Sequence, residues 1–142
     1  MLMNFVLGIS MMVFCLFLQG ILVLVALRFF SRREHIVGAS FAASMRVTAG
    51  MMAILILGNI FQVMAWGGLF YLLGEFDDFA VAVYHSAVNF ATLGYGDIVM
   101  SPEHELLGPL EALNGVLMVG VSTAALSRAF SEALKDRIPQ SH

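Results

Sequence analysis

The chain has 142 residues, of which 60% are hydrophobic and 12% are charged. A soluble domain carries about 25% charged residues, so this composition excludes an ordinary soluble domain and predicts an integral membrane protein in contact with lipid. The formal net charge of −3 gives no basis for expecting a nucleic-acid partner. The single cysteine, Cys15, cannot form a disulfide within the chain and is interpreted as a small apolar residue.

The first apolar run extends from Phe5 to Leu27 and predicts a membrane span. At 1.5 Å per residue it is about 35 Å long, which is enough to cross a bilayer with some tilt. A cleaved signal peptide is the alternative, but no basic residue precedes the run and no small-x-small cleavage site follows it. We therefore expect a retained transmembrane helix at 1–30, followed by a basic linker at 31–46.

Two further apolar runs predict two more spans. One extends over about 47–73 and ends in aromatic residues that are typical of a membrane interface. The other, at about 106–130, carries small and hydroxyl residues that allow close helix packing. Residues 47–130 are expected to form one domain, and residues 131–142 a short tail.

A polar segment separates the second and third spans. Asp77 and Asp78 are suitable N-caps for a helix at about 78–91, which is too short to cross a bilayer. The sequence TLGYGD follows at 92–97. Irregular backbone at membrane depth persists only when it is buried in protein or lines water. The segment therefore predicts a loop that dips into the membrane beside a water-filled path.

The distribution of charges predicts the orientation. Basic residues lie only between the first two spans and from the end of the third span onward: Arg28, Arg32, Arg33, Arg46, Arg128, Lys135 and Arg137. The positive-inside rule places both groups in the cytoplasm, so the N-terminus and the dipping loop are expected outside. Acidic residues gather near that loop: Glu75, Asp77, Asp78, Asp97, Glu103 and Glu105. Together they would concentrate cations at a pore mouth, although each acid alone is more simply a solvated surface residue.

The glycine stretch has the chemistry of a cation site. A dehydrated cation needs oxygen atoms in place of its water, and successive backbone carbonyls supply them when the chain alternates in conformation. Such alternation requires some residues at positive φ, which glycine adopts without steric cost. Gly94 and Gly96 stand at two such positions, and Thr92 adds a hydroxyl.

The sequence TLGYGD resembles the selectivity filter of potassium channels, with Leu93 in place of the usual valine. The resemblance extends from about Arg46 to Asp136, and NGVLMVGVSTAAL is similar to the inner helix of the bacterial two-helix pore type. It implies an all-α membrane protein with the tetrameric potassium-channel pore fold and an added first helix. It also implies that potassium ions, with no other cofactor, bind the carbonyls of Thr92, Leu93, Gly94, Tyr95 and Gly96.

The resemblance also implies roles for residues around the filter. Tyr84 is expected near Asp97, and His85 near Tyr95. Val88 stands where the bacterial relative has a glutamate paired with the filter aspartate. In the inner helix the resemblance assigns a gating hinge to Gly115, for which close helix packing is a compatible interpretation. It places along the central cavity Val116, Val119, Thr123, Ala124 and Ser127.

Two ionisable side chains have competing interpretations. His85 is either a pH sensor or a neutral packing residue, and the second is favoured. Glu111 is an acid within the third span, where such a residue faces protein or water. A structural role for it is favoured over a functional one. A bond to the short helix, a bond to Asn114 and protonation all stay open.

One chain supplies one filter segment and a carbonyl ring needs four, so the resemblance implies a homotetramer in the plasma membrane. The first span has no arginine before Arg28, and the twelve residues after Phe130 are too few for a ligand-sensing domain. The hypothesis for gating is a cytoplasmic charge cluster of Arg46, Arg128, Glu132 and Asp136. A weakly selective cation channel and a non-conducting channel subunit are the alternatives. No catalytic constellation indicates an enzyme.

Overall fold

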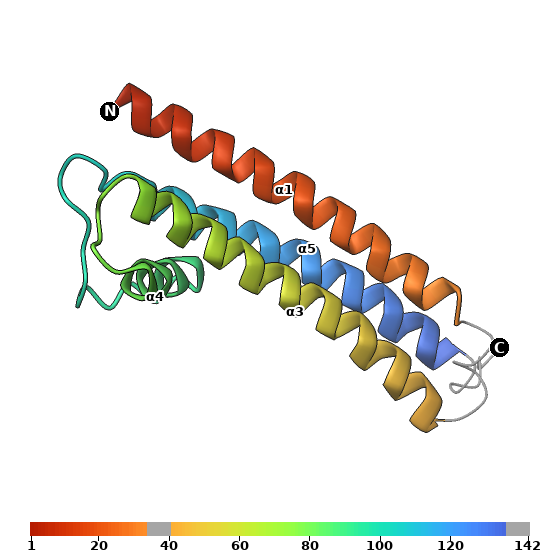
Figure 1. The fold of residues 1–142 in the computed structure, drawn as a ribbon. Coiled ribbons are helices and arrows are strands. Elements are labelled where there is room, and N and C mark those ends of the chain that lie inside the picture. Colours follow the sequence, from red (N-terminus) through yellow and green to blue (C-terminus); the bar gives the residue numbers. More distant parts are fainter. Residues whose placement is uncertain (34–40, 136–142) are drawn as a thin grey trace.

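The computed structural model describes residues 1–33 and 41–135, and the helices of this part are α1 (Leu2–Ser31), α3 (Phe41–Leu72), α4 (Phe79–Phe90) and α5 (Leu107–Lys135). The three long helices are each long and apolar enough to cross a membrane, whereas α4 is too short. Figure 1 shows the long helices side by side, with α4 and its loop near the N-terminal end of α1. The predicted order of three spans and one short helix is confirmed.

The helix bounds differ from the sequence prediction at two ends. α3 begins at Phe41 rather than at residue 47, so Arg46 belongs to the helix and not to the linker. α5 ends at Lys135, beyond the predicted limit of residue 130. Hydropathy marks the part of a helix that suits the bilayer, while its hydrogen-bonded turns continue past that limit. Pro109 is tolerated in α5 because it lies in the first turn, where its missing N–H has no helical partner.

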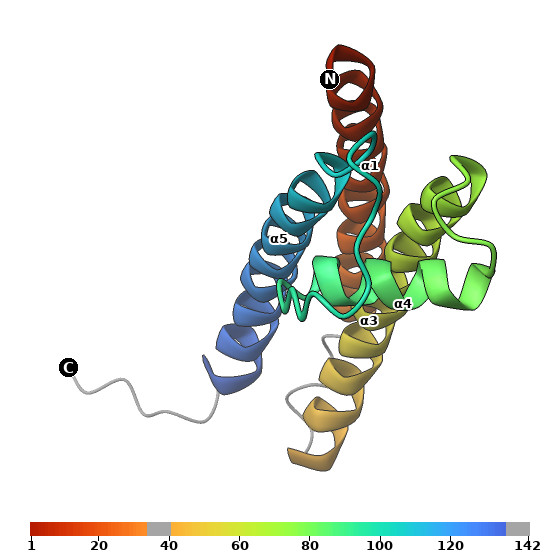
Figure 2. The same cartoon turned by 90° about the vertical axis from the view of Figure 1, so that its left-hand side faces the viewer.

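The first helix is an integral part of the bundle. α1 packs against both α3 and α5, and α4 packs against the same two helices. Figure 1 shows α1 and α4 on opposite sides of the α3–α5 pair, and Figure 2 shows α4 crossing the long helices. α1 therefore lies between α3 and α5, on the side of this pair that faces away from α4.

A buried polar chain joins the three long helices. The Gln62 side-chain amide of α3 donates to Gln19 Oε1 of α1 at 2.8 Å, and Gln19 Nε2 donates to Ser122 Oγ of α5 at 2.8 Å. Both glutamines are 0% exposed. Interhelical hydrogen bonds of this kind stabilise membrane bundles by roughly 0.6–2 kcal/mol each. They give α1 a defined rotation against its neighbours.

Gln19→Leu is expected to destabilise the bundle by about 1–3 kcal/mol, because it removes two hydrogen bonds and leaves the buried amide of Gln62 without a partner. Thermal unfolding in detergent measures the loss. The matched control is Phe17→Leu on the same helix, where the side chain is exposed on the described chain and should be replaceable at little cost. Equal melting temperatures for the two variants would show that the polar chain contributes nothing.

Candidate functional site

α4 holds the start of the glycine stretch at a fixed depth. It begins after Asp78, whose carboxylate accepts a hydrogen bond from the N–H of Ala80 at 2.7 Å, as the sequence predicted. It ends at Phe90, whose carbonyl oxygen packs against Gly115 of α5. The carbonyl end of α4 thus lies against the first third of α5. A helix C-terminus carries partial negative charge and favours a cation in front of it.

The backbone after α4 alternates in conformation. Thr92, Gly94 and Gly96 have φ values of 59°, 56° and 73°, while the residues between them stay outside the left-handed region. The positive φ predicted for the two glycines is confirmed. Thr92 adds a third such position, which sequence reasoning missed because a β-branched residue rarely adopts positive φ. The sign of φ therefore alternates over the five successive residues 92–96.

This stretch is exposed on the single chain. Residues 91–97 are all exposed, and Tyr95 and Leu93 keep 66% and 54% of their surface accessible. Irregular backbone and polar groups cannot face lipid at membrane depth. The segment therefore needs protein or water against it that the single chain does not supply.

The C-terminal end of the glycine stretch, directly after Gly96, is held by α4. The Tyr84 hydroxyl donates to Asp97 Oδ2 at 2.8 Å, which confirms the expected contact. Val88 is buried and apolar, so the partner of Asp97 in this chain is the tyrosine one turn earlier on α4.

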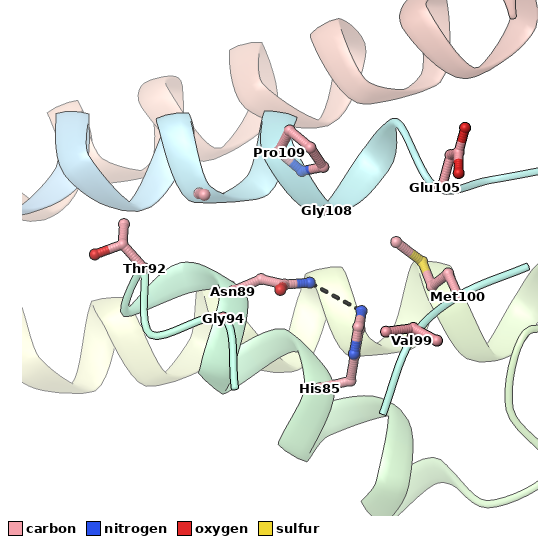
Figure 3. A pocket seen from close by; sticks show the side chains of 10 residues that line it. His85, Asn89, Thr92, Gly94, Val99, Met100, Glu105, Gly108 and Pro109 are labelled. Carbon is pink, nitrogen blue, oxygen red and sulfur yellow. Dashed lines mark hydrogen bonds between the residues drawn. The ribbon is translucent and has the colours of Figure 1, made fainter. Parts of the chain in front are cut away.

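Within the single chain both ring nitrogens of His85 have partners other than Tyr95, and the expected contact between His85 and Tyr95 stays a prediction. His85 Nδ1 instead donates to the carbonyl oxygen of Ile98 at 3.0 Å, and its Nε2 accepts from the side-chain amide of Asn89 at 2.9 Å, drawn in Figure 3. The ring packs against Phe70 and Phe76, with centroid distances of 5.7 and 5.0 Å, which hold it behind the stretch. Burial lowers the pKa of His85, and both ring nitrogens have the partners of a neutral imidazole. These contacts support the interpretation of His85 as a neutral packing residue.

A cavity of about 520 Å³ separates the glycine stretch from the start of α5. His85, Asn89, Thr92 and Gly94 line one side, and Figure 3 shows Gly108 and Pro109 of α5 opposite them. Sequence reasoning did not identify Asn89, whose side-chain amide donates to His85 within this wall.

A second cluster of hydrogen bonds joins the two outer loops, which connect α3 to α4 and α4 to α5. Glu75, which follows α3, accepts the backbone N–H of Ser101 at 2.6 Å, the Ser101 hydroxyl at 2.6 Å and His104 Nδ1 at 2.5 Å. Burial alone would raise the pKa of Glu75, but the hydrogen bonds from Ser101 and His104 outweigh it and lower the pKa. Glu75 is therefore a structural acid that holds the loops together. Sequence reasoning, which placed the acids either at a pore mouth or on a solvated surface, missed this role.

Glu75→Gln is expected to lower the stability of the outer loops by about 1–3 kcal/mol at neutral pH, because hydrogen bonds to a charged group are lost. The folded chain holds this pKa below the ordinary value of 4.5, so the carboxylate stabilises the fold above that pH and loses its effect as the pH falls through the lowered pKa. Melting temperatures of the wild type and the variant, measured between pH 7 and 3, should therefore converge on the acid side. A constant difference would contradict this role.

The residues expected along the cavity share one face of α5. Val116, Val119, Thr123, Ala124 and Ser127 are all exposed on the single chain, whereas Gly115 is buried against Phe90. Of the expected gating cluster, Arg46 donates from Nε to the carbonyl of Ala42 in its own helix at 3.4 Å, and Arg128 is exposed. The Glu132 side chain and Asp136 lie outside the described residues.

Comparison with known families decides the class of the protein. A family model described as ion channel matches residues 47–132, which include α4, the glycine stretch and most of α3 and α5. The chain belongs to this ion channel family. The family is the two-membrane-helix type with a potassium-channel-like pore, which confirms the resemblance and the all-helical channel fold. No curated protein and no solved structure matches the channel. The family match does not reach α1, which this channel adds to the two-helix pattern.

Proposed function

We propose that this ion channel is a homotetramer that conducts potassium ions selectively through a central pore. The backbone carbonyls of Thr92, Leu93, Gly94, Tyr95 and Gly96, with the Thr92 hydroxyl, replace the hydration shell of the ion. Asp97 and Tyr84 hold the outer end of this filter. No resident cofactor takes part, and potassium is the transported ion.

The alternation of φ at 92–96 is the observation that carries the proposal. In an ordinary strand, successive carbonyls point to opposite sides. A chain that alternates between left-handed and right-handed conformations turns them toward the same side, which a column of bare cations requires. Two of the three positive φ values are at glycines, which adopt them without steric cost, and the third is at Thr92, a β-branched residue for which such an angle is rare. The Thr92 conformation is therefore the part of the pattern that an ordinary glycine-rich loop does not explain.

The exposure of the filter supports the assembly. One chain contributes one filter strand, and a ring of carbonyls around an ion takes four. In the tetramer the exposed side chains of Tyr95 and Leu93 pack against neighbouring subunits, and the 520 Å³ cavity behind the filter gives room for such a contact. The exposed face of α5 that carries Val116 and Val119 then lines the central cavity.

The charge pattern supports the orientation. The basic residues near the C-terminal end of α1 and the N-terminal end of α3 face the cytoplasm by the positive-inside rule. The filter then opens to the outside of the plasma membrane, where Asp97 and the neighbouring acids raise the local concentration of cations. The charge cluster around Arg46 and Arg128 stays the candidate for gating.

Purified protein reconstituted into liposomes tests the proposal. Native mass spectrometry should give four chains per complex, and the liposomes should carry potassium but not sodium down its gradient, with block by barium. Equal sodium and potassium fluxes would favour the weakly selective cation channel. A complex with another number of chains would exclude the proposed filter.

A further inference from the structure

Ser86 connects three helices behind the filter. Its Oγ lies 2.8 Å from the carbonyl oxygen of Val63 in α3 and 2.5 Å from Oε1 of Glu111 in α5. Ser86 and Glu111 are both 0% exposed. The hydroxyl of α4 therefore sits between two oxygen atoms that belong to different helices.

The number of hydrogens at this junction fixes the state of the acid. A serine hydroxyl carries one hydrogen, and a backbone carbonyl can only accept. If Glu111 were ionised, both neighbours of Ser86 would be acceptors, and one of the two short contacts would hold no hydrogen. If Glu111 keeps its proton, it donates to Ser86 and Ser86 donates to Val63, so both contacts are hydrogen bonds. The 2.8 Å distance is normal for an O–H···O bond, and the 2.5 Å distance lies at the short end of the range.

The surroundings of Glu111 contain no compensating positive charge. Within the described part of the chain the one ion pair joins Glu75 and His104, at the outer loops. The titratable side chains near Glu111 are Cys15 of α1 and, beyond the amide of Asn89, His85 of α4, which is held neutral by its own contacts. α3 offers it the carbonyl of Val63 through Ser86 and no charged group. An unpaired carboxylate in such a place is strongly disfavoured.

We propose that Glu111 carries a proton and acts as a positioning residue that fixes α5 to α4, the helix before the filter, through Ser86. One turn further along both helices, Gly115 packs against the carbonyl of Phe90. The two contacts together set the height and rotation of α4 against α5, and Phe90 is two residues before Thr92. The consequence for the filter rests on the proposed function, whereas the protonation of Glu111 does not.

Infrared spectroscopy of the reconstituted wild-type protein tests the protonation without any need for conduction. At neutral pH we expect a carbonyl-stretch band of a protonated carboxylic acid that Glu111→Gln removes and that Glu103→Gln, at an exposed site, leaves in place. If the wild-type and Glu111→Gln spectra showed no difference in this band, the proposal would be overturned.

A pH profile of flux tests the positioning role. Wild-type flux should fall several-fold at strongly alkaline pH as Glu111 loses its proton, whereas Glu111→Gln should keep a flat profile because its amide still donates to Ser86. Superimposable profiles would show that Glu111 does not position the filter. If neither protein conducts, the proposed function fails, and the infrared result still decides whether Glu111 is protonated.

Discussion

Gly94→Ala is expected to abolish selective flux. A Cβ at this position meets no atom within 4 Å, so the effect comes from the backbone, which has a φ of 56°. A residue with a Cβ pays about 1–2 kcal/mol to adopt the left-handed conformation. In the proposed tetramer this cost acts four times on one ion column, about 4–8 kcal/mol in all. Flux should therefore fall by more than about 100-fold, since each 1.4 kcal/mol is a factor of ten.

Gly68→Ala is the matched control for this substitution. Gly68 lies within α3, its Cβ would also meet nothing within 4 Å, and its backbone is helical. The same chemical change should there leave potassium flux near the wild-type level. The tetramer content of both variants should be checked by native mass spectrometry. Wild-type flux in Gly94→Ala would show that the alternating backbone is not needed for conduction.

Gly115→Ala is expected to push α5 away from α4, the helix before the filter. An added Cβ would clash with the carbonyl group of Phe90, which is backbone and cannot move aside as a side chain does. Overpacking of a well-packed contact costs about 1–3 kcal/mol, and here it pushes directly on the residue that leads into the filter. We expect a lower melting temperature of the complex together with a loss of most of the selective flux.

Gly120→Ala distinguishes this packing role from a hinge role. Gly120 lies on the same helix, and a Cβ there would meet nothing within 4 Å. Both substitutions remove a flexible glycine from α5, but only one introduces a clash. If the main role of Gly115 is close packing, the melting temperature should fall in Gly115→Ala and not in Gly120→Ala. A normal melting temperature in Gly115→Ala with altered opening would instead assign the residue to the hinge.

The sequence predicted the spans because an apolar run long enough to cross a bilayer must satisfy its backbone hydrogen bonds internally, which favours a helix. It also predicted positive φ at Gly94 and Gly96, since the required conformations leave little choice of residue. The N-cap at Asp78 follows from local geometry at the start of a helix, whereas the contact of Tyr84 with Asp97 was implied by the resemblance to potassium channels.

The contacts that sequence reasoning missed depend on the paths of loops or on helix rotation. Glu75 and His104 are 29 residues apart, and their pairing requires both outer loops to fold back on each other. Gln19 and Gln62 were visible as polar interruptions of apolar runs, but their bond depends on how α1 rotates against α3. The bond of His85 to Ile98 was missed for a similar reason, because two aromatic residues from outside α4 decide where the His85 ring lies.

The reversal potential of a reconstituted channel tests the central claim most directly. Purified protein in a planar bilayer, with potassium on one side and sodium on the other, should give a current that reverses far toward the potassium equilibrium potential. This result would assign selectivity to the filter at 92–96 without help from any other protein. A current that reverses near zero would mean that sodium passes as readily as potassium, and it would contradict the proposed function.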